Sequence, residues 1–252
     1  MAPDRNGRFR LWAAAVWLAV WQAGSLALNQ PLLLPSPFTV ARCLASLAVT
    51  GGFWTSVGRS ALRILGGFLL ACGAGTGCAA LAARFRRFRE LLTPLLAVIK
   101  AVPVMSFIIL AFLWLPDKRY LSLLIAFLMV FPVVCGNVLT GIRETDRQLL
   151  EMARVFRVPL SRRLTGIYLP QIMPYFRSAA SVGLGLCWKS GVAAEVIGLA
   201  DGTLGEKLYQ SKIYFEVPEL FAWTVVIVAA SAAFEKLFLY LLDLLWERLG
   251  RL

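Results

Sequence analysis

Charged and helix-breaking residues within apolar stretches are the positions of this chain that could do chemistry. Lys100, Lys189 and Glu195 interrupt runs of apolar residues, and Pro103 and Asn137 stand in similar runs. A charge at the centre of a bilayer costs about 2.5–3.5 kcal/mol on insertion scales, so such residues usually face the protein interior or a watery cavity. These five residues are therefore candidates for lining a path through a membrane, and the two lysines would suit a small anion.

Structural roles for the lysines remain open at this stage. Either lysine could extend its ammonium group to a membrane surface, and Lys189 could pair with Glu195. A spacing of six residues is not the favoured i, i+4 spacing of a helical pair. Pairing within one helix is thereby weakened, and pairing with another helix is left open.

An acid–base site of a membrane enzyme would have to combine Glu195, Glu235 or Asp243 with Lys189 or Lys236. General acid–base catalysis needs such groups close together, whereas these lie on two separate stretches without a recognisable motif. The chain has no histidine, which excludes a histidine base or ligand, and its five cysteines lack C-x-x-C spacing. We therefore expect no catalytic site, no metal site and no enzyme activity in this chain.

The composition places these residues in an integral membrane protein. The chain is 59% hydrophobic and only 16% charged, with a mean hydropathy of +0.73, far above the balance of a soluble domain. The net charge of +12 could suggest a nucleic-acid partner. The basic residues instead cluster in short segments between apolar runs, as the positive-inside rule requires, so no nucleic acid is expected.

The apolar runs predict an all-α fold with about six transmembrane helices in one domain, residues 1–252. The expected spans are 11–28, 60–85, 91–115, 120–139, 172–199 and 220–246. A cleavable signal peptide is the alternative for the first, but the run is longer than usual and contains three tryptophans. With both termini inside, fifteen Lys and Arg residues fall on the inner side and seven on the outer side, which favours cytoplasmic termini.

Two smaller patterns predict local structure. Ser36 followed by Pro37 predicts the start of a short helix that lies on the outer surface. Gly73 and Gly77 form a G-x-x-x-G pattern, which predicts a close approach of two helices.

The segment 145–170 is the longest charged stretch and predicts a helix at the membrane surface. Thr145 with Gln148 fits a capping box, and Pro159 would stop the helix. Ser161 could cap a second turn. Two faces result at helical spacing: an apolar face expected to pack on the rest of the chain, and a charged face offered to a soluble partner. The apolar face contains Leu149, Met152, Ala153, Phe156 and Leu160, and the charged face contains Arg147, Glu151 and Arg154.

This segment also resembles the signature E-A-A-x3-G-x9-I-x-L-P of permease subunits of bacterial ABC importers. Met152 replaces the first alanine and Arg157 replaces the glycine, so the usual break between two coupling helices would have to come from Pro159 instead. The residues that the resemblance assigns to coupling with an ATPase are Glu151, Met152, Ala153, Arg154, Arg157, Ile167, Leu169 and Pro170.

Further motifs extend the resemblance to the nitrate/sulfonate/taurine branch of this binding-protein-dependent transport family. They are L-P-S-P before the second span, K-A-V-P in the third, W-K-x-x-x-A-A-E at 188–195 and L-F-A-W-T at 220–224. The resemblance implies a fold like that of type I ABC importer permeases in the bacterial inner (plasma) membrane. It also implies separate ABC ATPase subunits, an extracytoplasmic solute-binding protein, surrounding membrane lipid and a second permease copy.

The chain lacks the phosphate-binding pattern G-x-x-x-x-G-K-[ST], so we expect no cofactor here and place ATP and Mg on the partner ATPase. An identical second copy is expected, since one chain holds all the parts. The expected solute is a small anion such as nitrate, a sulfonate or taurine. Alternatives are a thiamine-precursor pyrimidine or another small neutral solute and, less in keeping with the segment 145–170, a substrate-capturing subunit of a vitamin importer.

Overall fold

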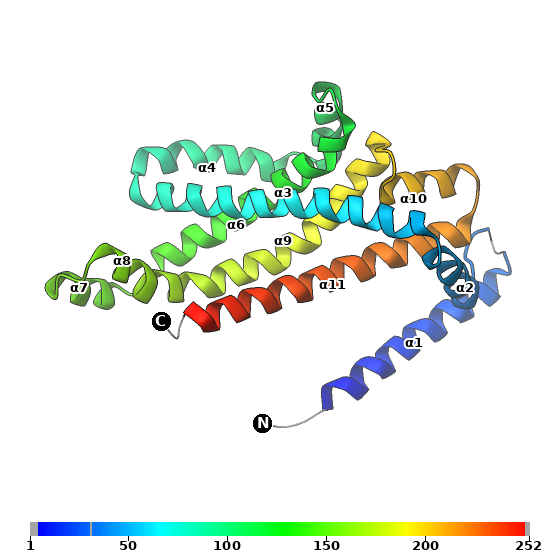
Figure 1. Cartoon of the computed structure of the whole chain (residues 1–252), viewed down its shortest axis with the longest axis horizontal. Coiled ribbons are helices and arrows are strands. Elements are labelled where there is room, and N and C mark those ends of the chain that lie inside the picture. Colours follow the sequence, from blue (N-terminus) through cyan, green and yellow to red (C-terminus); the bar gives the residue numbers. More distant parts are fainter. Residues whose placement is uncertain (1–4, 31, 250–252) are drawn as a thin grey trace.

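The computed structural model describes residues 5–30 and 32–249, and within them it contains only helices and their connections (Figure 1). The all-α prediction is confirmed. The 3₁₀ turn η1 (Lys118–Tyr120) and the π-helical turn η2 (Leu164–Tyr168) supplement the α-helices. The α-helices are α1 (Arg5–Leu28), α2 (Pro37–Ala48), α3 (Gly51–Arg84), α4 (Arg86–Ala101), α5 (Val104–Trp114), α6 (Leu121–Arg143), α7 (Arg147–Val155), α8 (Leu160–Arg163), α9 (Leu169–Gly198), α10 (Leu204–Ile213) and α11 (Val217–Leu249).

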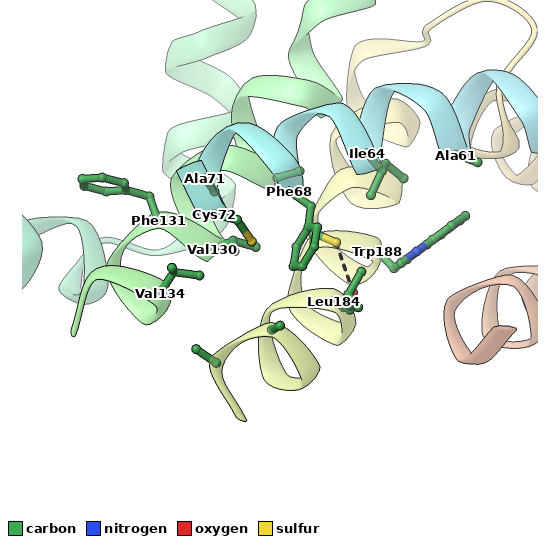
Figure 2. Close-up of a cluster of buried hydrophobic side chains, with 14 of the residues drawn as sticks. Ala61, Ile64, Phe68, Ala71, Cys72, Val130, Phe131, Val134, Leu184 and Trp188 are labelled. Carbon is green, nitrogen blue, oxygen red and sulfur yellow. Dashed lines mark hydrogen bonds between the residues drawn. The ribbon is translucent and has the colours of Figure 1, made fainter. Parts of the chain in front are cut away.

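Helix α6 forms the centre of the bundle and packs against α3 on one side and α9 on the other. The core between them contains Phe68 and Ile64 of α3, Val130 of α6, and Leu184 and Trp188 of α9, all buried (Figure 2). Dispersion contacts and close packing stabilise such an interface, because lipid provides no hydrophobic driving force between helices.

Glycines of α3 permit the closest approach between α3 and α6, but these glycines are not the expected pair Gly73 and Gly77. A Cβ atom at Gly67 would clash with the carbonyl oxygen of Leu123, and one at Gly75 would lie 3.0 Å from Val134. Gly73 and Gly77 have no neighbouring atom within 4 Å of such a Cβ. The predicted G-x-x-x-G contact is therefore wrong within this chain, because α6 meets the opposite face of α3.

The expected span 91–115 is broken in the middle. The chain bends by 102° between the two halves of this span, α4 and α5. Val102 has extended backbone angles, φ −72° and ψ 130°, and Pro103 stands at the N-cap of α5. A proline disfavours helical geometry in the residue before it and supplies no N–H group to the helix, so the chain bends here.

Three helices of the described part are long and apolar enough to cross a membrane, namely Gly51–Arg84, Lys118–Arg143 and Val217–Arg248. The bent pair α4–α5 gives a fourth if it counts as one span. The expected spans 11–28 and 172–199 coincide with α1, whose described apolar part is shorter, and with α9, which carries charged residues. The count of six spans remains a prediction.

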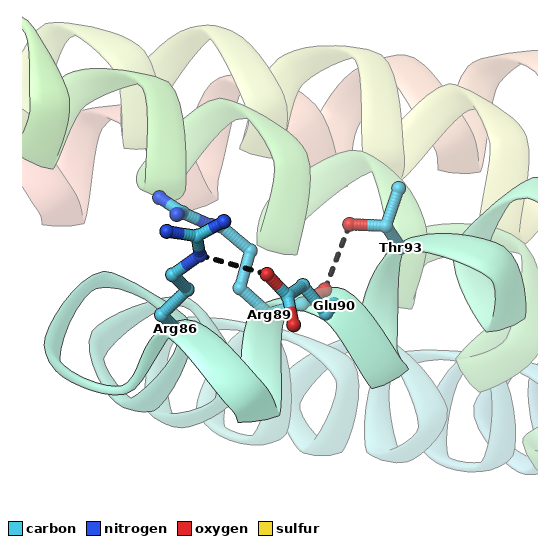
Figure 3. A network of polar contacts seen from close by, with 4 residues as sticks. All are labelled: Arg86, Arg89, Glu90 and Thr93. Carbon is cyan, nitrogen blue, oxygen red and sulfur yellow. Dashed lines mark hydrogen bonds and ion pairs between the residues drawn. The ribbon is translucent and has the colours of Figure 1, made fainter.

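The connection after α3 is a tight turn rich in arginine. Only Phe85 is non-helical there, so Arg84, Arg86, Arg87 and Arg89 belong to the ends of α3 and α4. Arg86 pairs with Glu90 at 2.8 Å, and the Thr93 hydroxyl donates to the carbonyl of Arg89 (Figure 3). This turn lies at the same end of the bundle as α7, α8 and the end of α11, whereas α2 and α10 lie at the other (Figure 1).

Candidate functional site

Helix α7 begins one residue later than the predicted capping box would place it. The carboxylate of Asp146 accepts a hydrogen bond from the backbone N–H of Gln148 at 2.8 Å and so caps the helix. Thr145 is buried and its hydroxyl donates to the carbonyl of Gly141. The predicted cap at Thr145 is therefore wrong, because that hydroxyl is used at the end of α6.

The other end of α7 is a Schellman motif rather than a stop at Pro159. Val158 N–H donates to the carbonyl of Ala153 at 2.9 Å, and Arg157 N–H donates to that of Arg154 at 3.1 Å. This pair of bonds requires a left-handed residue at the position after the cap, which is usually glycine. Arg157 occupies that position with φ +48°. The break therefore falls at Arg157 itself, two residues before Pro159.

Arg163 fixes this end of α7 and was not anticipated. Its Nε donates to the carbonyl of Val158 at 2.7 Å and its Nη2 donates to that of Ala153 at 3.1 Å. A basic side chain near the C-terminal end of a helix can donate to the carbonyls there and interacts favourably with the helix dipole. A spacing of ten residues from Ala153 carries no helical signal, so this contact could not be found from periodicity.

The expected second turn and the expected fifth span form one continuous helical segment. Pro159, and not Ser161, stands at the N-cap of α8, and α8 continues through η2 directly into α9. Leu169 N–H donates to the carbonyl of Leu164, five residues back, and this wider turn precedes Pro170, which has no N–H to donate. Ile167 is buried, and Leu169 and Pro170 are half-buried.

The predicted orientation of the apolar face of α7 is wrong except at one residue. Ala153 is fully buried, but the side chains of Met152 and Phe156 are 46% and 75% exposed. We call Leu149, Met152, Val155, Phe156 and Leu160 the α7 apolar surface, and all five are exposed. Glu151 and Arg154 are exposed too. A contiguous exposed apolar surface usually marks an interaction site, so α7 offers both apolar and charged groups outward.

The start of α7 is hydrogen-bonded to α9, and its end is hydrogen-bonded to α8. At its start, Asp146 N–H donates to the side chain of Gln171 on α9 at 2.8 Å. At its end, Arg163 of α8 holds the carbonyls of Ala153 and Val158. Hydrogen bonds therefore fasten α7 to α8 and α9 at two points.

Lys100 and Lys189, the two lysines of the expected spans, are exposed on the surface of this chain. A Cβ atom at Gly136 would lie 3.8 Å from Lys100 Nζ, so the ammonium group lies against α6. Asn137, next along α6, is half-buried and donates to the carbonyl of Val133. Pro103 is exposed at the bend between α4 and α5. Among the described residues, neither Lys100 nor Lys189 has a carboxylate within ion-pair distance.

Glu195 is not on an open surface, contrary to its predicted place beside a path. It is completely buried and joins three helices. Its Oε2 accepts from the hydroxyl of Ser60 on α3 at 2.7 Å and from Gly205 N–H on α10 at 3.3 Å. Leu204 N–H donates to the same Ser60 oxygen. Glu195 thus fixes α10 to the bundle, and it does not pair with the exposed Lys189.

The other acidic residues considered for acid–base chemistry have separate partners. Arg177 donates to both carboxylate oxygens of Asp243 at 2.9 and 3.0 Å, and Ser181 donates to Glu235. In the described part of the chain no group of three or more His, Cys, Asp or Glu residues could hold a metal ion. The residues suggested for an acid–base site are thus not brought together.

Comparison with known proteins decides the family. Residues 73–251 match the family model described as "Binding-protein-dependent transport system inner membrane component". The chain belongs to this family. The match covers α7, the π turn and α9, together with the proposed path residues on α4, α6 and α9.

Individual relatives cover most of the chain. The putative aliphatic sulfonates transport permease protein SsuC of Bacillus subtilis is 30% identical over 84% of this chain and 77% of its own length. The riboflavin transport system permease protein RibX of Chloroflexus aurantiacus is 29% identical, over 92% and 85%. The taurine transport system permease protein TauC of Escherichia coli is 26% identical, over 79% and 74%. A transport permease in a bacterial inner membrane follows from the family and the apolar helices.

The geometry of α7 gives a physical reason for two positions of the E-A-A-x3-G signature, the second alanine and the glycine. Ala153 is packed without exposed surface, so a larger side chain there would displace α7. The glycine position corresponds to Arg157, whose positive φ is the conformation that glycine adopts without strain. The substitution of glycine by arginine therefore preserves the break instead of removing it.

Proposed function

We propose that this chain forms the translocation path of an ATP-driven importer for a small organic anion of the sulfonate class. An extracytoplasmic binding protein delivers the anion, and a second, identical permease copy completes the path. ABC ATPase subunits dock on α7. The observation that supports this docking is the exposure of the α7 apolar surface on a short charged helix. Hydrogen bonds fasten this helix to α9 at its start and to α8 at its end.

The docking proposal has a direct physical basis. An amphipathic helix placed in a groove of a partner is a common mode of recognition, and Met152 and Phe156 supply apolar anchors. Glu151 and Arg154 lie beside them and would select the partner by charge. The turn with Arg84–Arg89 lies at the same end of the bundle (Figure 1). The basic residues there support a cytoplasmic position for this end and for both termini.

The preference for an anion rests on Lys100 and Lys189 together with the sulfonate and taurine relatives. Both ammonium groups are exposed in a monomer and lie within helices matched by the family model. Such a position is costly in lipid unless a watery space or a second copy covers it. An interface between two copies lined by four lysines would attract small anions without holding them tightly.

A neutral heterocyclic solute is the second candidate, favoured by the similarity to the riboflavin permease protein. Uptake of radiolabelled ethanesulfonate and riboflavin would separate the two, in cells that express the chain with its ATPase and binding protein. Lys100→Gln and Lys189→Gln should lower ethanesulfonate uptake, whereas Lys236→Gln, an exposed lysine of α11, should not. Normal uptake by both variants, or uptake of riboflavin alone, would refute the anion path.

A further inference from the structure

A strongly basic cavity lies at the end of the bundle away from α7. It has a volume of about 370 Å³ and is lined by Arg59, Leu62 and Arg63 of α3, Arg119 before α6, and Asp201 after α9. A second cavity of about 450 Å³ shares Arg119 and Asp201 and adds the backbone and side chains of residues 116–118 and 199–200. Four basic and two acidic side chains line the two cavities, which leaves an excess of positive charge.

The arginines of this cavity lack the partners that such groups normally have. Among the residues that the structure describes, neither Arg59 nor Arg63 has a carboxylate within ion-pair distance, and Arg119 reaches Asp117 only at 3.9 Å. The Nη1 atom of Arg63 is buried without any hydrogen-bond partner. A buried donor without a partner costs the full desolvation of that group. An acceptor from outside the chain would remove this cost.

Two further contacts hold the cavity open. The guanidinium of Arg59 lies against Gly202, where a Cβ atom would meet Arg59 Nη1 and where φ is +67°. Glu195 interacts electrostatically with Arg63 but lies beyond ion-pair distance of it; its Oε2 accepts from Ser60 and Gly205, and its buried Oε1, like Arg63 Nη1, has no hydrogen-bond partner. The walls are therefore set by packing of α3 against the turn between α9 and α10.

The depth of the cavity points to the level of lipid headgroups. Residues 64–83 of α3 contain no charged side chain, and twenty residues of helix span about 30 Å, the thickness of the hydrocarbon core. Arg63 and Arg84 thus mark the two edges of that core. Arginine binds tetrahedral oxyanions with two parallel hydrogen bonds, which suits phosphate and sulfonate groups equally.

We propose that Arg59, Arg63 and Arg119 form a binding site for a tetrahedral oxyanion, either the phosphate of a lipid headgroup or the sulfonate of a soluble molecule. The site is distinct from the proposed path residue Lys100. Gly136, which lies beside Lys100, is seventeen residues along the chain from Arg119, roughly 25 Å of helix. The proposal does not depend on which solute is transported, because Lys100 and Lys189 do not line this cavity.

The test uses the permease–ATPase complex in nanodiscs of phosphatidylcholine, with or without phosphatidylglycerol. Ethanesulfonate binding is titrated calorimetrically in the first, and retained phosphatidylglycerol is measured by native mass spectrometry in the second. Arg63→Gln and Arg119→Gln should each lower either the affinity for ethanesulfonate or the amount of retained phosphatidylglycerol about tenfold. Arg42→Gln, an exposed arginine of α2 stacked on Phe38, should leave both unchanged.

The outcomes separate the two sources of the anion and the failure of the proposal. Loss of ethanesulfonate binding alone identifies a soluble anion, and loss of retained lipid alone identifies a headgroup. Arg63→Lys keeps the charge but not the paired hydrogen bonds, so it should weaken binding less than Arg63→Gln. This variant shows whether the loss in Arg63→Gln comes from the missing charge rather than from misfolding. Equal weakening by Arg42→Gln, or unchanged binding of both probes in the Arg63 and Arg119 variants, would overturn the proposal.

Discussion

Replacing Arg157 by glycine tests whether the left-handed turn after α7 is what the family position requires. The backbone of Arg157 has φ +48°, a conformation that costs a residue with a Cβ about 1–2 kcal/mol and costs glycine almost nothing. Glycine also gains freedom in the opened state, which offsets about 0.4–1 kcal/mol. The Arg157 side chain is exposed. The net expectation is a gain of about 1 kcal/mol for the local structure, a fivefold smaller opening constant.

Hydrogen–deuterium exchange of the purified complex measures this opening directly. The amide N–H groups of Arg157 and Val158 close the Schellman motif, so their exchange should slow about fivefold in Arg157→Gly while transport and ATP hydrolysis persist. Arg157→Val is the matched control, because a β-branched residue is strained at positive φ, and its exchange should be faster. A folded Arg157→Gly variant without transport would show that the arginine itself has a role and would refute this reasoning.

Three further predictions concern docking, packing and topology. Glu151→Lys should abolish solute-stimulated ATP hydrolysis with the permease still in the membrane, whereas Glu247→Lys, exposed on α11 at the same end of the bundle, should not; stimulated hydrolysis in Glu151→Lys would refute the docking face. Gly67→Ala should destabilise the bundle by about 1–3 kcal/mol, since its Cβ would meet Leu123, whereas Gly73→Ala should melt like the parent protein; equal melting temperatures would contradict the packing. In single-cysteine variants, an impermeant maleimide on intact cells should label a cysteine at Lys212 and not one at Arg87. Labelling of the cysteine at Arg87 alone would invert the topology. At the native Cys43, burial and the carboxylates of Glu219 and Glu216 raise the pKa of the thiol. Labelling of Cys43 should therefore be slow at neutral pH and become faster as the pH rises.

A local signal in the sequence predicted the start of α2. Ser36 caps α2 by accepting from Thr39 N–H at 3.2 Å, with Pro37 at the first helical position, as expected. Such a cap needs only the residues within a turn of it. Other local signals were insufficient: the break at Pro103 falls inside the expected span 91–115, and the caps of α7 and α8 are Asp146 and Pro159 rather than Thr145 and Ser161.

The features that were missed depend on which face of a helix meets a neighbour. Glycines occur on several faces of α3, and the sequence does not say that α6 covers Gly67 and Gly75 rather than Gly73. The apolar face of α7 has the same spacing whether it packs inward or is exposed for a partner. Glu195 is a similar case, because its buried position depends on Ser60, 135 residues earlier in the chain. Periodicity predicts which residues share one face of a helix. Only the tertiary structure shows which neighbour, if any, packs against that face.

The contacts of α7 also explain how a short helix with little buried surface keeps a fixed position on the bundle. Its only fully buried side chain is Ala153, whose carbonyl accepts from both Val158 N–H and Arg163. Arg163 lies in α8, and α8 continues through η2 into α9, the helix that carries Lys189 and Glu195. Because hydrogen bonds rather than a broad apolar interface fasten α7, its outward groups are left free for a partner while its position remains coupled to α9. Hydrogen bonds thus join α7 to α8 and α9, and Glu195 of α9 is joined in turn to Ser60 of α3 and to α10.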